Sequence, residues 1–259
     1  MVLYYYVSLK SFVEMWEEKP GATSSFMLPA IELMHRVQEA EVEYGLSVLR
    51  ESIGLYEEQN HIPVELSKKE MPFYRQDSRS LVGPEMGMYI VPLYERPDLS
   101  FPCEGPGLVL ELDYSALGEH CLFENLFLLR CKYNRKPVVE EFLAKLETEY
   151  DKFFFDEEHT GFTADSRFFS MLCNACMEVR DPALEPEKEW RLAGLKSPDE
   201  VVYRYTQGDL LPYFPISLPV DCLRRIYLRD LKEHPLLHGT LINFLKSKGL
   251  PAEQLLGLS

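Results

Sequence analysis

Apolar residues follow two different spacings along this chain, and each spacing predicts a different kind of element. Segment 107–114 alternates most cleanly, because Leu108, Leu110 and Leu112 would share one face of an extended strand. Short runs rich in β-branched and aromatic residues predict further strands. The expected strands are 2–8, 87–94, 107–114, 125–133, 189–195, 201–216 and 223–229, with turns at Ser197-Pro198 and Gln207-Gly208.

Between these runs, apolar positions recur every three or four residues, which predicts amphipathic helices. The strongest stripe follows Pro137 and includes Phe142 and Leu146. Ser11 is expected to cap a short first helix, and Gly249 to stop the last one. The expected helices are 12–18, 30–56, 137–153, 164–179 and 235–249, and the proline-broken stretch 60–85 is expected to be a long connection.

The order of these elements predicts the fold class. Strands come in groups, and helices lie between the groups, which favours an α+β fold over a regular alternation of strands and helices. We therefore expect a mixed, largely antiparallel sheet with flanking helices. A single domain over 1–259 is expected, with 235–259 as a C-terminal helix and tail.

Composition narrows the classes of partner. The chain has 42 acidic and 27 basic residues, a formal net charge of −15, and its longest basic segment is 223–232. Such a charge repels phosphate backbones, so nucleic-acid binding is disfavoured, while a protein partner or a homo-oligomer stays open. No basic leader and no run of about 18 apolar residues is found, so no membrane partner is expected. Six scattered cysteines fit reduced thiols, and a cytoplasmic protein is expected.

Common catalytic and nucleotide-binding motifs are absent from the sequence. The glycine patterns of dinucleotide folds and P-loops do not occur, nor do the G-x-S-x-G and H-E-x-x-H signatures. Cys173 and Cys176 form one C-x-x-C pair, but zinc sites usually need two such pairs. On a helix they continue a core stripe with Phe169 and Leu172, so packing is favoured over metal or redox chemistry, and no metal site is predicted.

The acid-rich stretch 185–192 is the main candidate for chemistry. As a strand over 187–193 it would place Glu187, Glu189 and Arg191 on one face, and Trp190 and Leu192 on a core face. Spacing alone favours an exposed face of weakly interacting ion pairs, worth about 0–1 kcal/mol each. The alternative is a carboxylate held by Arg191 at the edge of a cleft, where it could orient a hydroxyl or stabilise positive charge.

These features resemble an uncharacterised bacterial family, the domain-of-unknown-function family twenty-nine seventy-one. The resemblance is carried by the Tyr-rich opening "LYYYVS", the strand "GLVLELDY", the E-x-E-W-R element Glu187–Arg191, and the later "LLPYFPI" and "I-Y-L" segments. It spans nearly the whole chain and is most specific around 185–228. The region "ERPDLSFPCEGPG" departs from the Met-Trp and tyrosine pattern of such proteins.

A more distant likeness is to ADP-ribosyltransferase-type proteins, which use NAD as substrate. The likeness implies Glu189 as the catalytic carboxylate, with Glu187 beside it, and Tyr5 or Tyr6 near the nicotinamide. Arg191 would contact the site and keep Glu189 ionised. This is an analogy between folds, and no cofactor is otherwise implied.

Two other functions stay open. The first is a non-catalytic binding or interaction protein in which the "EKEWR" strand is structural. The second is a metal-dependent nuclease or phosphodiesterase using Asp113, Glu111 and Glu189. The transferase requires Glu189 in a concave pocket near Tyr5 or Tyr6. The binding protein instead requires Glu189 to be exposed or tied to a structural arginine, with an exposed apolar patch elsewhere.

Overall fold

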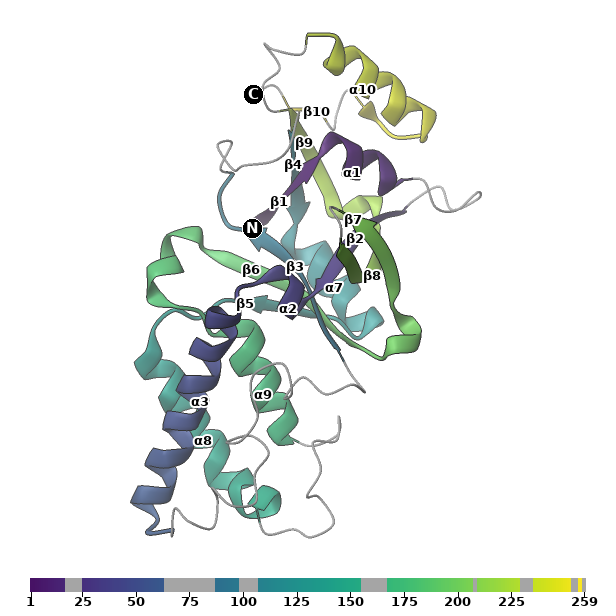
Figure 1. Ribbon diagram of the computed structural model, residues 1–259. Coiled ribbons are helices and arrows are strands. Elements are labelled where there is room, and N and C mark those ends of the chain that lie inside the picture. The colour runs from purple at the N-terminus through teal and green to yellow at the C-terminus, as the bar shows by residue number, and fades with distance from the viewer. Residues whose placement is uncertain are drawn as a thin grey trace.

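A curved sheet forms the centre of the molecule, and three long helices project from it (Figure 1). The computed structural model describes residues 1–16, 25–62, 87–97, 107–154, 167–206, 209–228, 235–252 and 256–257. Between the described strands every pairing is antiparallel except that of β9 with β10. The predicted α+β class with a mixed, largely antiparallel sheet is therefore confirmed.

The main path of the sheet runs β10-β9-β4-β1-β3-β2-β8-β7, and β6 joins it by pairing with both β3 and β5. The strands are β1 Val2–Ser8, β2 Ser25–Glu32, β3 Gly87–Tyr94, β4 Gly107–Asp113, β5 Phe127–Arg130, β6 Glu189–Lys196, β7 Val202–Thr206, β8 Asp209–Pro219, β9 Leu223–Leu228 and β10 Leu256–Gly257. The strand over 107–113 has the expected alternation, and the expected segment 201–216, with its turn at 207–208, corresponds to the paired strands β7 and β8.

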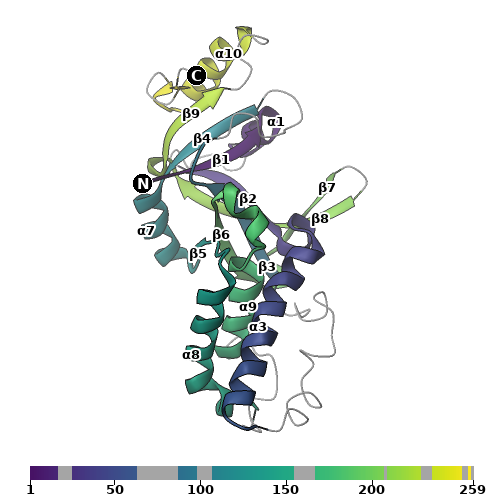
Figure 2. The ribbon, with the colours of Figure 1, turned by 90° about the vertical axis from the view of Figure 1, so that its left-hand side faces the viewer.

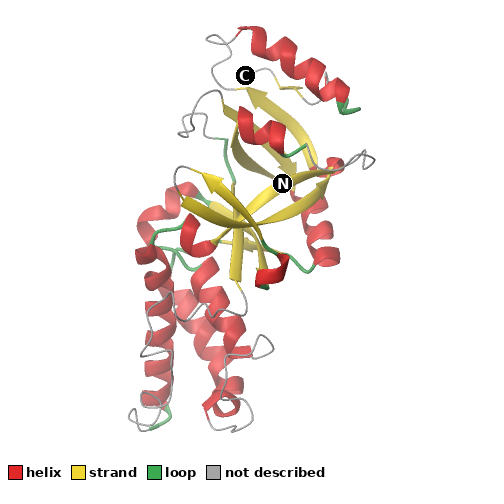
Figure 3. Cartoon of the chain, turned by 45° about the vertical axis from the view of Figure 1, so that its right-hand side comes forward, coloured by secondary structure: helices red, strands yellow, loops and turns green. Residues whose placement is uncertain are grey.

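The helices divide between two sides of this sheet. They are α1 Leu9–Glu14, α2 Leu33–Arg36, α3 Glu39–Gln59, α7 Tyr114–Glu124, α8 Arg135–Phe154, α9 Arg167–Glu178 and α10 Pro235–Ser247. Helices α3, α8 and α9 pack together as a separate layer, here called the helical arm (Figures 2 and 3). Helices α1, α7 and α10 pack on the other core.

Strands β3 and β6 separate the two cores. On β3, Met88 and Ile90 point to the helical arm, while Val91 and Leu93 point to the opposite core. Strand β6 pairs with β3 along its whole length and alternates in the same way. The face of β6 that holds Ala193 is therefore covered by the arm.

Several expected boundaries are wrong. The expected helix 30–56 begins with strand β2, in which Phe26, Leu28 and Ala30 alternate as buried residues, and the long helix α3 starts only at residue 39. Strand 125–133 shrinks to β5, and at its start Asn125 is the left-handed C-cap of helix α7, a helix that the sequence pattern does not predict. The first helix is capped by Ser8 instead of Ser11.

One correction affects the candidate site directly. The expected strand 189–195 is confirmed as β6, but the strand over 187–193 that would add Glu187 to its charged face does not form, because residues 182–187 form a 3-10 turn, here called η2 (Pro182–Glu187). Lys188 ends that turn with a positive φ of 48° and reverses the chain into β6. Glu187 therefore lies before the strand. The expected turn at Gln207-Gly208 and nearly all of the expected connection 60–85 fall outside the described residues.

Candidate functional site

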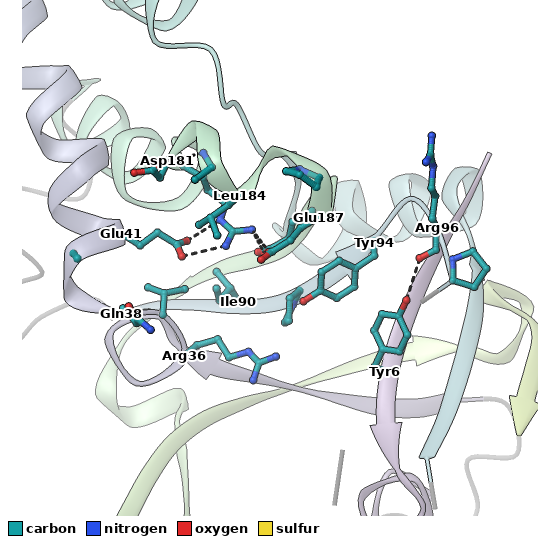
Figure 4. Close-up of a pocket in the computed structure, with 18 residues that line it drawn as sticks. Tyr6, Arg36, Gln38, Glu41, Ile90, Tyr94, Arg96, Asp181, Leu184 and Glu187 are labelled. Atoms are coloured by element: carbon teal, nitrogen blue, oxygen red, sulfur yellow. Dashed lines mark hydrogen bonds and ion pairs between the residues drawn. The ribbon is translucent and has the colours of Figure 1, made fainter. Parts of the chain in front are cut away.

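A cavity of about 1010 Å³ opens where the base of the helical arm meets the sheet (Figure 4). Its apolar floor comes from Ile90 and Pro92 on β3, and Leu184 on η2 covers one side. The rest of the lining is mixed. Its polar and charged residues are Tyr6, Arg36, Gln38, Glu41, Tyr94, Arg96, Arg180, Asp181, Glu187 and Glu189, and its apolar residues are Val37, Ala40, Pro97, Ala183 and Pro186.

Glu189 is at the first position of β6 and is only 5% exposed. Both of its carboxylate oxygens are occupied: Oε1 accepts from Arg191 Nε at 2.6 Å, and Oε2 accepts from Arg180 Nη1 at 2.5 Å. Its backbone N–H donates to the Tyr133 hydroxyl at 2.9 Å. The carboxylate is thus fixed by two guanidinium groups.

Arg180, directly after α9, joins three carboxylates. Its Nε and Nη2 donate to the two oxygens of Glu41 at 2.9 and 3.1 Å, and its Nη1 also donates to Glu187 at 2.8 Å. Burial opposes the positive charge, but the carboxylates of Glu189 and Glu41 outweigh it and raise the pKa of Arg180. Arg180 therefore stays charged at every ordinary pH.

Arg191 has no exposed surface and lies behind Glu189, away from the cavity lining. Its Nη1 donates to the Met177 carbonyl at 2.9 Å, and its Nη2 bonds Glu41. Burial again opposes the charge and Glu189 again outweighs it, so the pKa of Arg191 is raised. The pair Arg191–Glu189 thus joins strand β6 to the helical arm.

These five side chains form a cluster that we call the ion cluster: Glu41, Arg180, Glu187, Glu189 and Arg191. It holds three carboxylates and two guanidinium groups, so one negative charge is left in excess. Glu187 carries that excess towards solvent, because its side chain is 42% exposed while the other four are 12% exposed or less. Buried charges are stable only when paired in this way.

Two tyrosines face the cavity. The Tyr6 and Tyr94 rings lie 5.2 Å apart, and the Tyr6 hydroxyl donates to the Arg96 carbonyl at 3.0 Å. Burial and then the charge of Glu189 raise the pKa of Tyr94, so its phenol stays protonated. Figure 4 shows the Arg36 side chain reaching into the cavity towards Tyr94, whereas the Arg96 side chain points away.

The structure brings together three of the five expected site residues. Tyr6, Glu187 and Glu189 line the cavity, and Arg191 supports Glu189 from behind. Tyr5 lies on the opposite face of β1 and packs against the other core. The expectation of an exposed ion-pair face is wrong for Glu189 and Arg191, because the helical arm covers that face of β6.

Sequence reasoning missed four residues of this region: Glu41, Arg180, Tyr94 and Arg36. Glu41 is one of three acidic residues at 39, 41 and 43, and the apolar stripe of this segment indicates a solvent-facing side for them. Arg180 offers a weak signal, since it is an isolated base just after a strongly apolar helix. Tyr94 ends a strand and faces Glu189 across the β3–β6 pairing, which the sequence does not reveal.

The remaining candidate chemistry is structural. Cys173 and Cys176 are buried in the core of the helical arm, as expected, and burial raises the pKa of the Cys173 thiol to about 12. Asp113 caps α7, and Glu111 accepts from the Tyr227 hydroxyl at 2.6 Å. Within the described ranges, no group of three His, Cys, Asp or Glu side chains is placed to hold a metal ion.

Comparison with known proteins adds no relative. No family model, no curated protein and no solved structure matches the chain. Among the described residues, no helix has both the length and the apolar character needed to cross a membrane.

Proposed function

We propose that this chain is a non-catalytic binding protein, that the ion cluster is a structural support, and that the cavity above it is the ligand site. One observation carries the proposal: both oxygens of Glu189 are already bound by buried arginines. A catalytic carboxylate needs an oxygen directed at the substrate. Glu189 has none to offer without breaking a buried ion pair, which costs several kcal/mol.

Exposed apolar side chains support an interaction role as well. Leu122 and Phe123 at the end of α7 are 84% and 85% exposed. On the hairpin β7–β8, Tyr203 and Tyr205 are also exposed. Adjacent exposed apolar residues of this size are typical of contact surfaces, so a protein partner fits the same proposal.

An NAD-using transferase is the second candidate. It is favoured by the placement of Tyr6, Glu187 and Glu189 around one cavity. In that case Glu187, with its exposed side chain and a single arginine partner, would be the acid that meets the ribose, and Glu189 would hold Arg180 in place. The nuclease is less favoured, since Asp113 and Glu111 are paired elsewhere on β4 and do not line this cavity.

Calorimetric titration with NAD separates the first two candidates. We expect no saturable heat from the wild type. Glu187→Gln is the informative variant, because Glu187 is exposed and its loss leaves the buried pairs intact. Saturable NAD binding that this variant abolishes, together with release of nicotinamide by the wild type only, would replace the binding proposal by the transferase.

A cavity-filling variant tests binding itself. Leu184→Trp places an indole in the cavity, while Leu236→Trp adds the same group at an exposed site on α10. Affinity selection from a library of small charged and aromatic molecules should retain compounds on the wild type and on Leu236→Trp. Leu184→Trp should lose them. If all three proteins retain the same compounds, or none does, the cavity is no ligand site.

The resemblance to the domain-of-unknown-function family twenty-nine seventy-one stays a prediction, since no family model matches the chain. Its most specific part, around 185–228, includes the element Glu187–Arg191. In the proposed function that element is a support for the cavity, and the family assigns it no reaction.

A further inference from the structure

Arg36 is a cation exposed to the cavity. It is the last residue of α2, and its guanidinium forms no hydrogen bond or ion pair with any residue in the ranges that the structure describes. Figure 4 shows its guanidinium directed across the cavity towards Tyr94. A planar guanidinium offers several N–H donors that match a carboxylate or phosphate, so this wall favours an anionic group.

Glu187 lies on the opposite wall and has the opposite charge. Among the residues that the structure describes, its one arginine partner is Arg180, which it shares with Glu41 and Glu189. The ion cluster is therefore one positive charge short, and the exposed carboxylate of Glu187 is where a further cation would restore the balance. An ammonium group supplies that charge and several donors.

Arg36 and Glu187 do not neutralise each other. Both line the cavity, yet no ion pair within 4.0 Å joins them. The pKa of Tyr94 responds to both charges. Burial is the main cause of its raised pKa, the carboxylates of Glu189 and Glu187 raise it further, and the guanidinium of Arg36 lowers it. Two opposite charges thus face one cavity from two walls, with the Tyr94 ring between them (Figure 4), and Ile90 and Pro92 add apolar surface to the same cavity.

From this arrangement we infer that the ligand is a zwitterion with an apolar or aromatic body, such as an amino-acid derivative or a short peptide with free ends. Its carboxylate pairs with Arg36, its ammonium pairs with Glu187, and its body lies against Tyr94, Ile90 and Pro92. The cavity volume of about 1010 Å³ is at the upper end of the range for small-molecule sites and accommodates such a ligand. This inference rests on the proposed binding function.

Short peptides of increasing length test it. We would titrate Ala-Phe, Ala-Phe-Ala and Ala-Phe-Phe-Ala, each with free ends, and then the best binder as its C-terminal amide and as its N-acetyl form. We expect saturable binding of at least one free peptide. Amidation should weaken it by about tenfold to a hundredfold, the range for losing a charged hydrogen bond, and acetylation by a similar factor.

Variants assign each end of the peptide to a side chain. Arg36→Gln should weaken binding of the free peptide by the same factor as amidation and leave the affinity for the amide unchanged. Glu187→Gln should weaken it by the same factor as acetylation and leave the affinity for the N-acetyl form unchanged. Arg204→Gln is the matched control, because that arginine is exposed on β7 and does not line the cavity, and it should have no effect.

Each result decides something. If Arg36→Gln, or blocking of either end of the peptide, leaves the affinity for the peptide unchanged, the zwitterion inference is overturned. The zwitterion inference is also overturned if no peptide binds, while library compounds bind the wild type and are lost on Leu184→Trp. In that case the binding function stands. If neither peptides nor library compounds bind, both proposals fall together.

Discussion

Arg191 Nε lies 2.6 Å from Glu189 Oε1, and the two residues are two positions apart on strand β6. Alternation along a strand puts them on one face, as the sequence indicates. That face is buried, because the base of the helical arm covers it, and both side chains are at most 5% exposed. The motif that suggests an active site is thus an internal tie between the sheet and the arm.

Loss of the Glu189 charge should destabilise the fold. In Glu189→Gln, the buried Arg180 and Arg191 would each lose a carboxylate contact, and we expect the free energy of unfolding to fall by about 3 kcal/mol or more. Urea denaturation followed by circular dichroism measures this loss.

Glu187→Gln is the control for that prediction. It removes a carboxylate from the same arginine, but the side chain is 42% exposed, so the change should stay within about 1 kcal/mol. A Glu189→Gln protein as stable as Glu187→Gln would mean that Glu189 is not a structural residue, and the transferase would regain its favoured acid.

The sequence reveals the two faces of β6 but not that both are covered. Trp190 and Leu192 point to a core, as their alternation predicts. The other face is covered by a helix that contributes Glu41, a residue 150 positions from Arg191. Local spacing contains no information on such a distant contact. Spacing therefore predicted that Glu189 and Arg191 share a face and could not predict that this face is buried.

Proline residues and one left-handed residue explain other differences between the expected and the observed elements. Strand β2 contains Pro29, which reads as a break, yet its alternation of Phe26, Leu28 and Ala30 is clean and the strand pairs fully with β8. The turn before Glu189 contains Pro186 and places Lys188 in the left-handed region. Neither feature belongs to the simple period-two pattern, so Glu187 does not share the face of β6 that holds Glu189 and Arg191.

The packing of α3 on α9 should tolerate no side chain at Gly45. A Cβ built there would lie 1.9 Å from the Ala175 carbonyl oxygen, and a backbone atom cannot move aside cheaply. Gly45→Ala should therefore cost about 1–3 kcal/mol or more, measured as a fall in the urea midpoint.

Gly54 on the same helix is the matched site. Nothing lies within 4 Å of a Cβ there, and the position is exposed. Gly54→Ala should raise stability by about 0.4–1 kcal/mol, because alanine loses less backbone entropy in a helix. Equal effects at the two positions would mean that α3 and α9 do not approach so closely.

The C-x-x-C pair should behave as packing and not as a metal or redox site. Burial raises the pKa values of both Cys173 and Cys176, so little thiolate is available at pH 8. Alkylation followed by peptide mass spectrometry should modify these two residues only after denaturation in urea. Addition of zinc or of a chelator should leave the melting temperature unchanged. Rapid labelling of the native protein, or a rise in melting temperature with zinc, would contradict this.

Asp113 connects the end of β4 to the start of α7. Its Oδ1 accepts from the Ala116 N–H at 2.9 Å, and its Oδ2 accepts from Arg224 Nε at 2.6 Å. The bond from Ala116 is the main cause that holds the pKa of Asp113 below its ordinary value of 3.8; burial opposes it, and Arg224 adds to it. The ionised form is thus favoured in the folded state.

The lowered pKa of Asp113 predicts how a variant responds to acid. A carboxyl whose pKa is depressed on folding contributes stability above its ordinary value, and that contribution is lost as the pH falls through the folded pKa. Asp113→Asn keeps the acceptor for Ala116 but removes the charge, so it should be less stable than the wild type at pH 7. The difference should shrink once the pH falls below 3.8. Urea midpoints of the two proteins across this range test the prediction.

Arg224→Gln should reduce the pH-dependent part of the stability without removing it, because the main contribution comes from the hydrogen bond of Ala116. A difference between wild type and Asp113→Asn that stays constant down to pH 3 would contradict a depressed pKa at this cap.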